Sequence, residues 1–209
     1  IFKYPLETRL QCRNLSFQDE TKFVLQHHKR NKNIINLINK MKNNTLVLFG
    51  RINYGKSMYN SLLNINKNSK KQIFYIDGIT KTISKKTDIV TRESIRQILE
   101  TSNDNIVMAS KQVFSTGINI QNLHNIILIN AGRSKITIMQ SIGRGLRLHK
   151  SKKYLKVIDI IDNLQITTKE KNNLDKQGIE VSSGKNYLLK HFLQRLKLYD
   201  IEKFKYKNI

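Results

Sequence analysis

The hydrophobic residues of this chain fall into short apolar runs that alternate with longer segments whose apolar positions recur at helical spacing. Short apolar runs bounded by polar residues are typical of buried strands, and a recurrence every three or four residues is typical of amphipathic helices. The runs predict strands at 45–49, 72–76, 105–109, 125–129 and 155–161, and the periodic segments predict helices at 54–64, 88–100 and 135–146.

This alternation of strands and helices favours an α/β fold in which helices flank a parallel sheet. Functional loops follow the carboxyl ends of such strands, so we expect the motifs to lie at one edge of the sheet. Segment 17–42 predicts two short helices, 163–185 a polar linker, and 186–198 an amphipathic helix. The predicted domains are an entry segment at 1–42, the α/β domain at 43–164, and a linker with a C-terminal helical appendage at 165–209.

Length and composition limit the class of protein. A chain of 209 residues has room for one main domain, and its 39% hydrophobic residues suffice for a core. No apolar run approaches the about 18 residues of a membrane span and no signal peptide opens the chain, so we expect a soluble, cytoplasmic protein. Because the chain starts at Ile1 with no clear period, we expect it to be cut from a longer protein.

The cysteine and histidine content gives little support to a metal site. The lone Cys12 excludes an internal disulfide and any multi-cysteine zinc site. Five histidines show no metal-ligand spacing, and the adjacent His27 and His28 would point to different faces of a helix. We therefore expect no bound metal on this chain's own residues.

The charge of the chain indicates a polyanionic partner. Thirty-eight Lys and Arg against fifteen Asp and Glu give a formal net charge of +23. Compositional drift in a chain rich in Lys, Asn and Ile is the alternative explanation, but drift would not place Arg residues in motifs. We therefore expect the partner to be nucleic acid.

Segment 46–63, "LVLFGRINYGKSMYNSLL", contains the letter pattern of a phosphate-binding P-loop, from Gly50 to Lys56 and Ser57. A predicted strand precedes it and a predicted helix follows, as a P-loop requires. Against this, the loop interior 51–54 is bulky, whereas a loop that wraps phosphates often has small residues. An acidic partner would have to come from Asp77, Asp159 or Asp162. An ATP site that uses Lys56 stays open as a hypothesis.

A second candidate motif is "QSIGRGLR", residues 140–147, at the end of a predicted helix. Arg144 and Arg147 are three residues apart and would share a helical face, while Gly143 and Gly145 would let a backbone come close. Two guanidinium groups suit a triphosphate because each planar fork binds phosphate oxygens in a bidentate manner. The alternative is an ordinary solvated basic helix end.

The segment "ASKQVFSTGINIQNLHNIILIN", residues 109–130, precedes "QSIGRGLR", and the two together resemble motifs V and VI of the second RecA-like domain of superfamily-two helicases. The chain also resembles the UvsW-type branch of T-even-like phages through "NTLVLFGR", "RESIRQILE" and "NYLLKHFLQRLKLYDIEKFKY". This resemblance runs from about residue 31 onward. It implies the RecA-like C-terminal lobe of an ATP-dependent DNA helicase that remodels branched DNA in recombination and repair.

The resemblance also implies partners and nucleotide contacts. ATP with Mg²⁺ would be bound mainly by an upstream RecA-like lobe of the same protein, in a bacterial or phage-infected cell. Arg144 and Arg147 would be arginine fingers, Asn119 would contact the ribose beside Gly117, and Gln140 would link the nucleotide to motif V. Residues 50–57 would be motif IV, which makes the P-loop letters a coincidence.

The same resemblance implies contacts to the DNA backbone from loops along the sheet. The residues at these positions are Arg51, Gly78, Thr80, Ser110, Lys111 and Thr116. The alternative for each is an ordinary loop residue. Tyr75 and Phe114 have apolar neighbours and are predicted to be core residues. Two other functions stay open, namely a non-catalytic basic module that binds nucleic acid, and a self-contained P-loop ATPase.

Overall fold

The structure is a computed structural model that describes residues 1–69, 71–77, 83–84, 92–113, 120–130, 135–147, 149–150, 152–181 and 186–207. Its elements are β1 (Phe2–Lys3), α1 (Leu6–Gln11), α2 (Phe17–Gln26), α3 (His28–Lys40), β2 (Thr45–Phe49), α4 (Ile52–Ile65), β3 (Ile73–Ile76), β4 (Ile83–Ser84), α5 (Arg92–Thr101), β5 (Ile106–Ser110), β6 (Asn125–Leu128), α7 (Lys135–Gly145), β7 (Lys156–Asp159), β8 (Asp162–Asn163), α8 (Thr168–Asp175) and α9 (Tyr187–Ile201).

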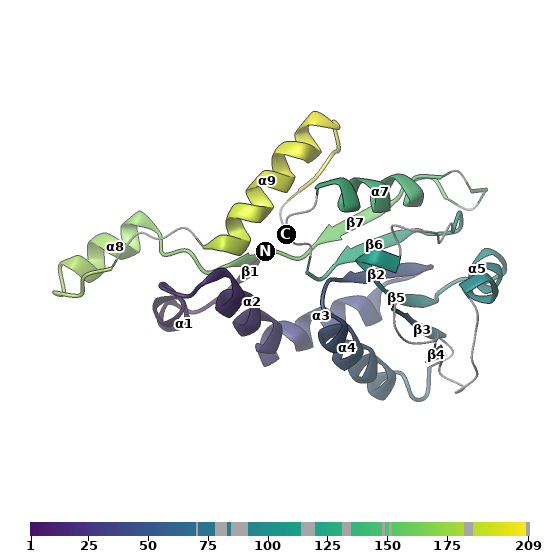
Figure 1. Ribbon diagram of the computed structural model, residues 1–209, viewed down its shortest axis with the longest axis horizontal. Helices are drawn as coiled ribbons and strands as arrows, with labels where there is room; N and C mark the ends of the chain where they lie inside the picture. Colours follow the sequence, from purple (N-terminus) through teal and green to yellow (C-terminus); the bar gives the residue numbers. More distant parts are fainter. Residues whose placement is uncertain are drawn as a thin grey trace. The chain divides into compact units, whose positions relative to one another are not determined.

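The main sheet has the strand order β4-β3-β5-β2-β6-β7 (Figure 1), and all its neighbouring strands are parallel except the pair β3 and β4. Helix α4 contacts β2, β3 and β5, while α7 contacts β6 from the other side of the sheet (Figure 1). The predicted α/β class with a parallel sheet flanked by helices is confirmed.

The central strand β2 is apolar along its length because both of its faces are covered. Its residues are at most 1% exposed, and Leu48 is level with Ala109 of β5 and Leu128 of β6. Burying a Leu or Val side chain stabilises a fold by about 1.5–3 kcal/mol, so this run is a large share of the core.

Tyr75 is 1% exposed, which confirms it as a core residue, whereas Phe114 lies outside the described residues.

The chain forms two compact units, which are described separately. One consists of residues 31–160 and contains the six-stranded sheet; the other combines residues 1–30 with 161–209. The boundaries predicted from sequence, 1–42, 43–164 and 165–209, are consecutive segments, whereas the second unit joins both parts of the chain that flank the sheet. Sequence patterns do not reveal such pairing because they are local.

In the second unit, β1 pairs with β8 in parallel and α2 packs against α9. The Glu20 carboxylate of α2 accepts hydrogen bonds from the first two amides of α9, Tyr187 N at 2.9 Å and Leu188 N at 2.7 Å. These amides have no partner within the helix, so Glu20 caps α9. Burial nevertheless raises the pKa of Glu20, because desolvation penalises its charged form.

A buried ion pair also links the two segments of this unit. Arg30 donates from Nε to Asp162 Oδ1 at 2.6 Å, and the Tyr4 hydroxyl donates to the same oxygen at 2.7 Å. Arg30 and Asp162 are 1% and 5% exposed. Desolvation, followed by the Asp162 charge, raises the pKa of Tyr4, so its hydroxyl stays a donor. The hypothesis that Asp162 is an acidic partner of the P-loop letters is wrong, because its carboxylate binds Arg30 and Tyr4.

The predicted linker contains helix α8, which the polar composition concealed. Thr167 and Glu170 form a capping box at its start, and Arg9 of α1 binds Glu170 through two nitrogens at 2.6 and 2.8 Å. These bonds from Arg9 lower the pKa of Glu170 to about 2.

No helix within the described part of the chain is long and apolar enough to cross a membrane.

Candidate functional site

The P-loop letters do not form a phosphate-binding loop. Strand β2 ends at Phe49 and α4 begins at Ile52, so only Gly50 and Arg51 lie between them. Gly55, Lys56 and Ser57 are inside the helix, and the Gly55 amide donates to the Arg51 carbonyl at 2.9 Å. A P-loop needs such amides to face the phosphates, whereas here the helix already uses this one.

Gly55 is explained by packing. A Cβ atom at this position would lie 2.4 Å from Cδ2 of Phe49, which is closer than two non-bonded carbon atoms approach each other. The Phe49 ring is itself fixed, because it is fully buried and stacks on Tyr75 with ring centroids 5.4 Å apart. The glycine therefore lets α4 pack closely on β2, and no nucleotide is needed to account for it.

The carboxyl edge of the sheet brings together Arg51, Ser110 and Lys111, the described members of the predicted DNA-contact set. Phe49 and Ser110 are level in neighbouring strands, so Arg51 and Lys111 leave the sheet close to each other. The Lys111 ammonium donates to the Asn130 carbonyl beyond β6 and would lie 3.3 Å from a Cβ on Gly50. Arg51 is exposed. Gly78, Thr80 and Thr116 lie outside the described residues.

The arginine motif lies at the end of α7. Arg144 is half-buried in the last turn of the helix, whereas Arg147 is exposed and lies two residues beyond Gly145, where α7 ends. The Arg147 amide contacts the Arg144 carbonyl at 3.5 Å, so a loose turn continues the helical path. The two guanidinium groups therefore belong to one local structure, although only Arg144 is in the helix.

Two contacts fix this end of α7 against the sheet. A Cβ on Gly145 would lie 2.8 Å from Ile126 Cδ1 and from Leu155 Cδ2, so a larger residue would have to push these methyl groups aside, whereas Gly143 has nothing within 4 Å. The Lys152 ammonium donates to the Gly145 carbonyl at 2.7 Å and satisfies a group that the helix end leaves open. Burial lowers the pKa of Lys152.

The arginine end therefore lies at the amino edge of the sheet. Ile126 is the second residue of β6, and Leu155 directly precedes β7. The expectation that all motifs share the carboxyl edge is wrong, because α7 follows the carboxyl end of β6 and runs back along the sheet. Gln140 is exposed on α7, and Gly117 and Asn119 lie outside the described residues. The two candidate surfaces occupy opposite edges.

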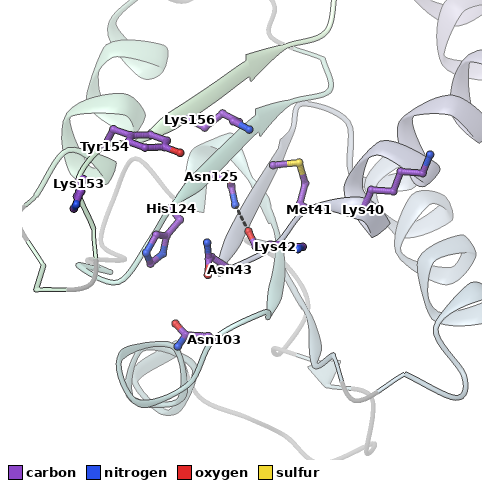
Figure 2. A pocket seen from close by; sticks show the side chains of 10 residues that line it. All are labelled: Lys40, Met41, Lys42, Asn43, Asn103, His124, Asn125, Lys153, Tyr154 and Lys156. Atoms are coloured by element: carbon purple, nitrogen blue, oxygen red, sulfur yellow. Dashed lines mark hydrogen bonds between the residues drawn. The ribbon is translucent and has the colours of Figure 1, made fainter.

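The amino edge also has a cavity that sequence reasoning missed. It has a volume of about 610 Å³, and Figure 2 shows the ten side chains that line it. They come from the residues before or at the start of four strands, β2, β5, β6 and β7. The residues are Lys40, Met41, Lys42, Asn43, Asn103, His124, Asn125, Lys153, Tyr154 and Lys156.

The described residues contain no group of three or more His, Cys, Asp or Glu side chains that could hold a metal ion. Cys12 is buried, and desolvation raises the pKa of its thiol to about 11, which keeps it protonated.

The fold, the arginine turn after α7 and the sequence together define a class of protein. Residues 29–149 match the family described as the helicase conserved C-terminal domain, and the chain belongs to this family. Its described structure has the RecA-like sheet of a second helicase lobe.

One relative matches the chain over nearly its whole length. The ATP-dependent DNA helicase UvsW of Enterobacteria phage T4 is 34% identical over 207 residues, which are 98% of this chain and 38% of that protein. The crystal structure of T4 UvsW superposes with a TM-score of 0.75 at 32% identity, over 98% of this chain and 39% of that one. The resemblance to UvsW-type helicases is confirmed, and this chain spans well under half of the relative's length.

A second relative matches a shorter part. The putative ATP-dependent helicase IRC3 of Saccharomyces cerevisiae is 32% identical over 94 residues, which are 44% of this chain and 14% of that protein.

Proposed function

We propose that this chain is the C-terminal lobe of an ATP-dependent DNA helicase that remodels branched DNA. The observation that carries the proposal is the similarity to T4 UvsW, an ATP-dependent DNA helicase, over 98% of the chain in both sequence and structure. The partners would be DNA and an upstream RecA-like lobe of the same protein. The location would be the cytoplasm of a bacterial or phage-infected cell, where such DNA is found.

The nucleotide would be ATP with Mg²⁺, held mainly by the upstream lobe. Of this chain's residues, Arg144 and Arg147 fit a triphosphate, because their guanidinium forks stand on a turn that Gly145 and Lys152 hold against the sheet. ATP hydrolysis supplies the free energy of the cycle. The two arginines would act as fingers that stabilise charge on the transferred phosphoryl group. Gln140, Gly117 and Asn119 are proposed as supporting contacts to the nucleotide.

The DNA would bind at the opposite edge of the same sheet. A net charge of +23 supports binding to a polyanion, and Arg51 and Lys111 lie close together there. These residues, with Ser110, Gly78, Thr80 and Thr116, are proposed to hold phosphates rather than to distinguish bases. Closure of the two lobes on ATP would move this edge with the arginine turn, because both belong to one unit.

ATPase activity tests the proposal. It should be measured with and without branched DNA for this chain alone and for the longer protein that includes the upstream lobe. We expect turnover only in the longer protein. Arg147→Ala should reduce kcat by about a thousandfold or more, the usual effect of removing an arginine finger. Lys56→Ala should leave kcat unchanged, because Lys56 is an exposed residue inside α4.

Two outcomes would contradict the proposal. Hydrolysis by the short chain that depends on Lys56 would mean that the P-loop letters bind ATP after all. A longer protein that binds DNA but does not hydrolyse ATP, with or without Arg147, would instead indicate a non-catalytic nucleic-acid-binding module.

A further inference from the structure

The amino-edge cavity, defined above by its ten lining residues, has an unusual balance of charge. Four of those residues are lysines, and none is Asp or Glu. Lys40 and Lys42 come from the segment before β2, whereas Lys153 and Lys156 come from the segment that enters β7, so the charges lie on two sides of the cavity (Figure 2). Such an arrangement attracts an anion that extends from one side to the other.

Carboxylates near this edge are already engaged. Asp104 accepts a hydrogen bond from the Asn43 amide. Glu100 accepts from the Gln121 amide at 2.7 Å and lies 3.8 Å from His149. These bonds hold the two carboxylates at the backbone and beside His149, and neither Asp104 nor Glu100 is among the residues that line the cavity.

Tyr154 adds an aromatic surface to the cavity. The residue is 74% exposed, the largest exposed fraction of any large hydrophobic residue in the described part of the chain. It stands between Lys153 and Lys156 in sequence, and Figure 2 shows its ring at the cavity. An exposed ring costs hydrophobic free energy unless a partner covers it. A base can stack on such a ring while neighbouring lysines hold its phosphates.

A buried network of asparagines adjoins the cavity, because it joins Asn44, the neighbour of the lining residue Asn43, to the lining residue Asn125. Asn44 is fully buried and donates to the Leu99 and Ser102 carbonyls, both at 2.8 Å. Its Oδ1 accepts from Asn105 Nδ2 at 3.0 Å, and Asn125 Nδ2 donates to the Lys42 carbonyl at 2.7 Å (Figure 2). A satisfied polar network resists rearrangement. The segment that carries Lys42 is therefore held in place before any ligand arrives.

The backbone of this edge supports the same conclusion. Asn43 and Asp104 have positive φ angles of 65° and 62°, a conformation that Asn and Asp tolerate better than most residues. The two residues hydrogen-bond each other, so the turns before β2 and β5 brace one another.

We propose that the amino-edge cavity binds single-stranded DNA, with Lys42, Lys153 and Lys156 on phosphates and a base stacked on Tyr154. The inference rests on the proposed function in taking DNA as the polyanion. It adds a second DNA contact on the edge opposite Arg51 and Lys111. Lysine ammonium groups bind phosphates as point charges and suit a flexible strand, whereas a bound nucleotide usually meets planar forks or a helix start. An unpaired base is required because a duplex hides its base faces.

Fluorescence anisotropy with a labelled oligothymidylate tests the proposal on the 209-residue chain. We expect Tyr154→Ala to weaken binding at least about fivefold and Tyr154→Phe to keep most of the affinity, because stacking needs only the ring. Lys153→Ala/Lys156→Ala should reduce the slope of log K against log salt by about 1.4, or about 0.7 for each lost phosphate contact. The matched control is Lys205→Ala/Lys207→Ala, which removes two exposed charges from the other unit. This control should reduce the slope by less than half of the change expected for Lys153→Ala/Lys156→Ala.

Two results with the variants would overturn this inference: unchanged binding by Tyr154→Ala and by Lys153→Ala/Lys156→Ala, or an equal loss of salt dependence in the Lys205→Ala/Lys207→Ala control. Tighter binding of duplex than of single-stranded DNA would also overturn it. So would displacement of the oligonucleotide by ATP at equal phosphate concentration. Thermal unfolding of every variant must match the parent chain. A separate Arg51→Ala/Lys111→Ala variant distinguishes failure of this inference from failure of the proposed function. If only that variant loses binding, the carboxyl-edge contact stands and the amino-edge contact does not.

Discussion

Gly55 and Gly145 share a property that their sequence context does not reveal, since at each position another side chain occupies the space of a Cβ atom. At Gly55 the neighbour is Phe49 on β2, and at Gly145 the neighbours are Ile126 and Leu155. Both glycines lie in motifs that suggest phosphate chemistry. Their immediate role is to let a helix approach the sheet, which shows why a motif needs its structural context before it supports a function.

Substituting Gly55 tests this packing. Gly55→Ala should destabilise the chain by about 1–3 kcal/mol in urea unfolding, because the Phe49 ring is confined by Tyr75 and cannot move aside. The matched control is Gly143→Ala, also inside a helix but with no atom within 4 Å of the new Cβ. It should stabilise the chain by about 0.5–1 kcal/mol through helix propensity. A neutral Gly55→Ala would mean that α4 and β2 are not packed this closely.

At the scale of elements, the strands and long helices were predictable and the short ones were not. β2 matches its predicted range of 45–49, and α7 differs from its prediction by one residue, because buried apolar runs and amphipathic repeats are strong local signals. Strands β1 and β8 have two residues each and exist only because Phe2 pairs with Asp162. Helix α8 has few apolar residues, but its capping box from Thr167 to Glu170 was visible in the sequence.

The cap of α8 should give the stability of the chain a dependence on acid. Glu170 has its pKa lowered from 4.5 to about 2 by Arg9, so it contributes stability above about pH 4.5 that is lost as the pH falls toward 2. Glu170→Gln should lower the Tm at neutral pH by about 1–3 °C, a small value because the pair is partly exposed.

Melting curves between about pH 2 and pH 7 check this expectation. The difference in Tm between Glu170→Gln and the parent chain should shrink as the pH falls and as salt is added. A difference that is constant over this range would show that the charge of Glu170 contributes nothing to the fold.

The whole molecule shows why only part of the candidate site was predictable. The motif "QSIGRGLR" marked Arg144 and Arg147, but their position at the amino edge depends on the direction of α7. The amino-edge cavity left no signal, because Lys40, Lys42, Lys153 and Lys156 are far apart in a lysine-rich sequence. The parallel pairing of β2, β6 and β7 brings them together.

The unit formed by residues 1–30 and 161–209 depends on the pair Arg30 and Asp162. Arg30→Met should cost about 3–5 kcal/mol in urea unfolding, because it leaves the Asp162 carboxylate buried without its cation. Arg30→Met/Asp162→Leu should recover part of this loss, since no charge is then stranded. If the double variant is no more stable than the single one, the loss caused by Arg30→Met does not come from a buried carboxylate left without its cation.

The pairing of β1 with β8 also has a consequence for the order of folding. During synthesis, residues 31–160 can complete their sheet soon after they emerge, because all its strands lie within that segment. Residues 1–30 emerge earlier but must wait for a strand about 160 residues downstream. Contacts at such separation form slowly. Residues 1–30 are therefore synthesised before the sheet but become structured after it, and until then their apolar residues stay exposed to solvent.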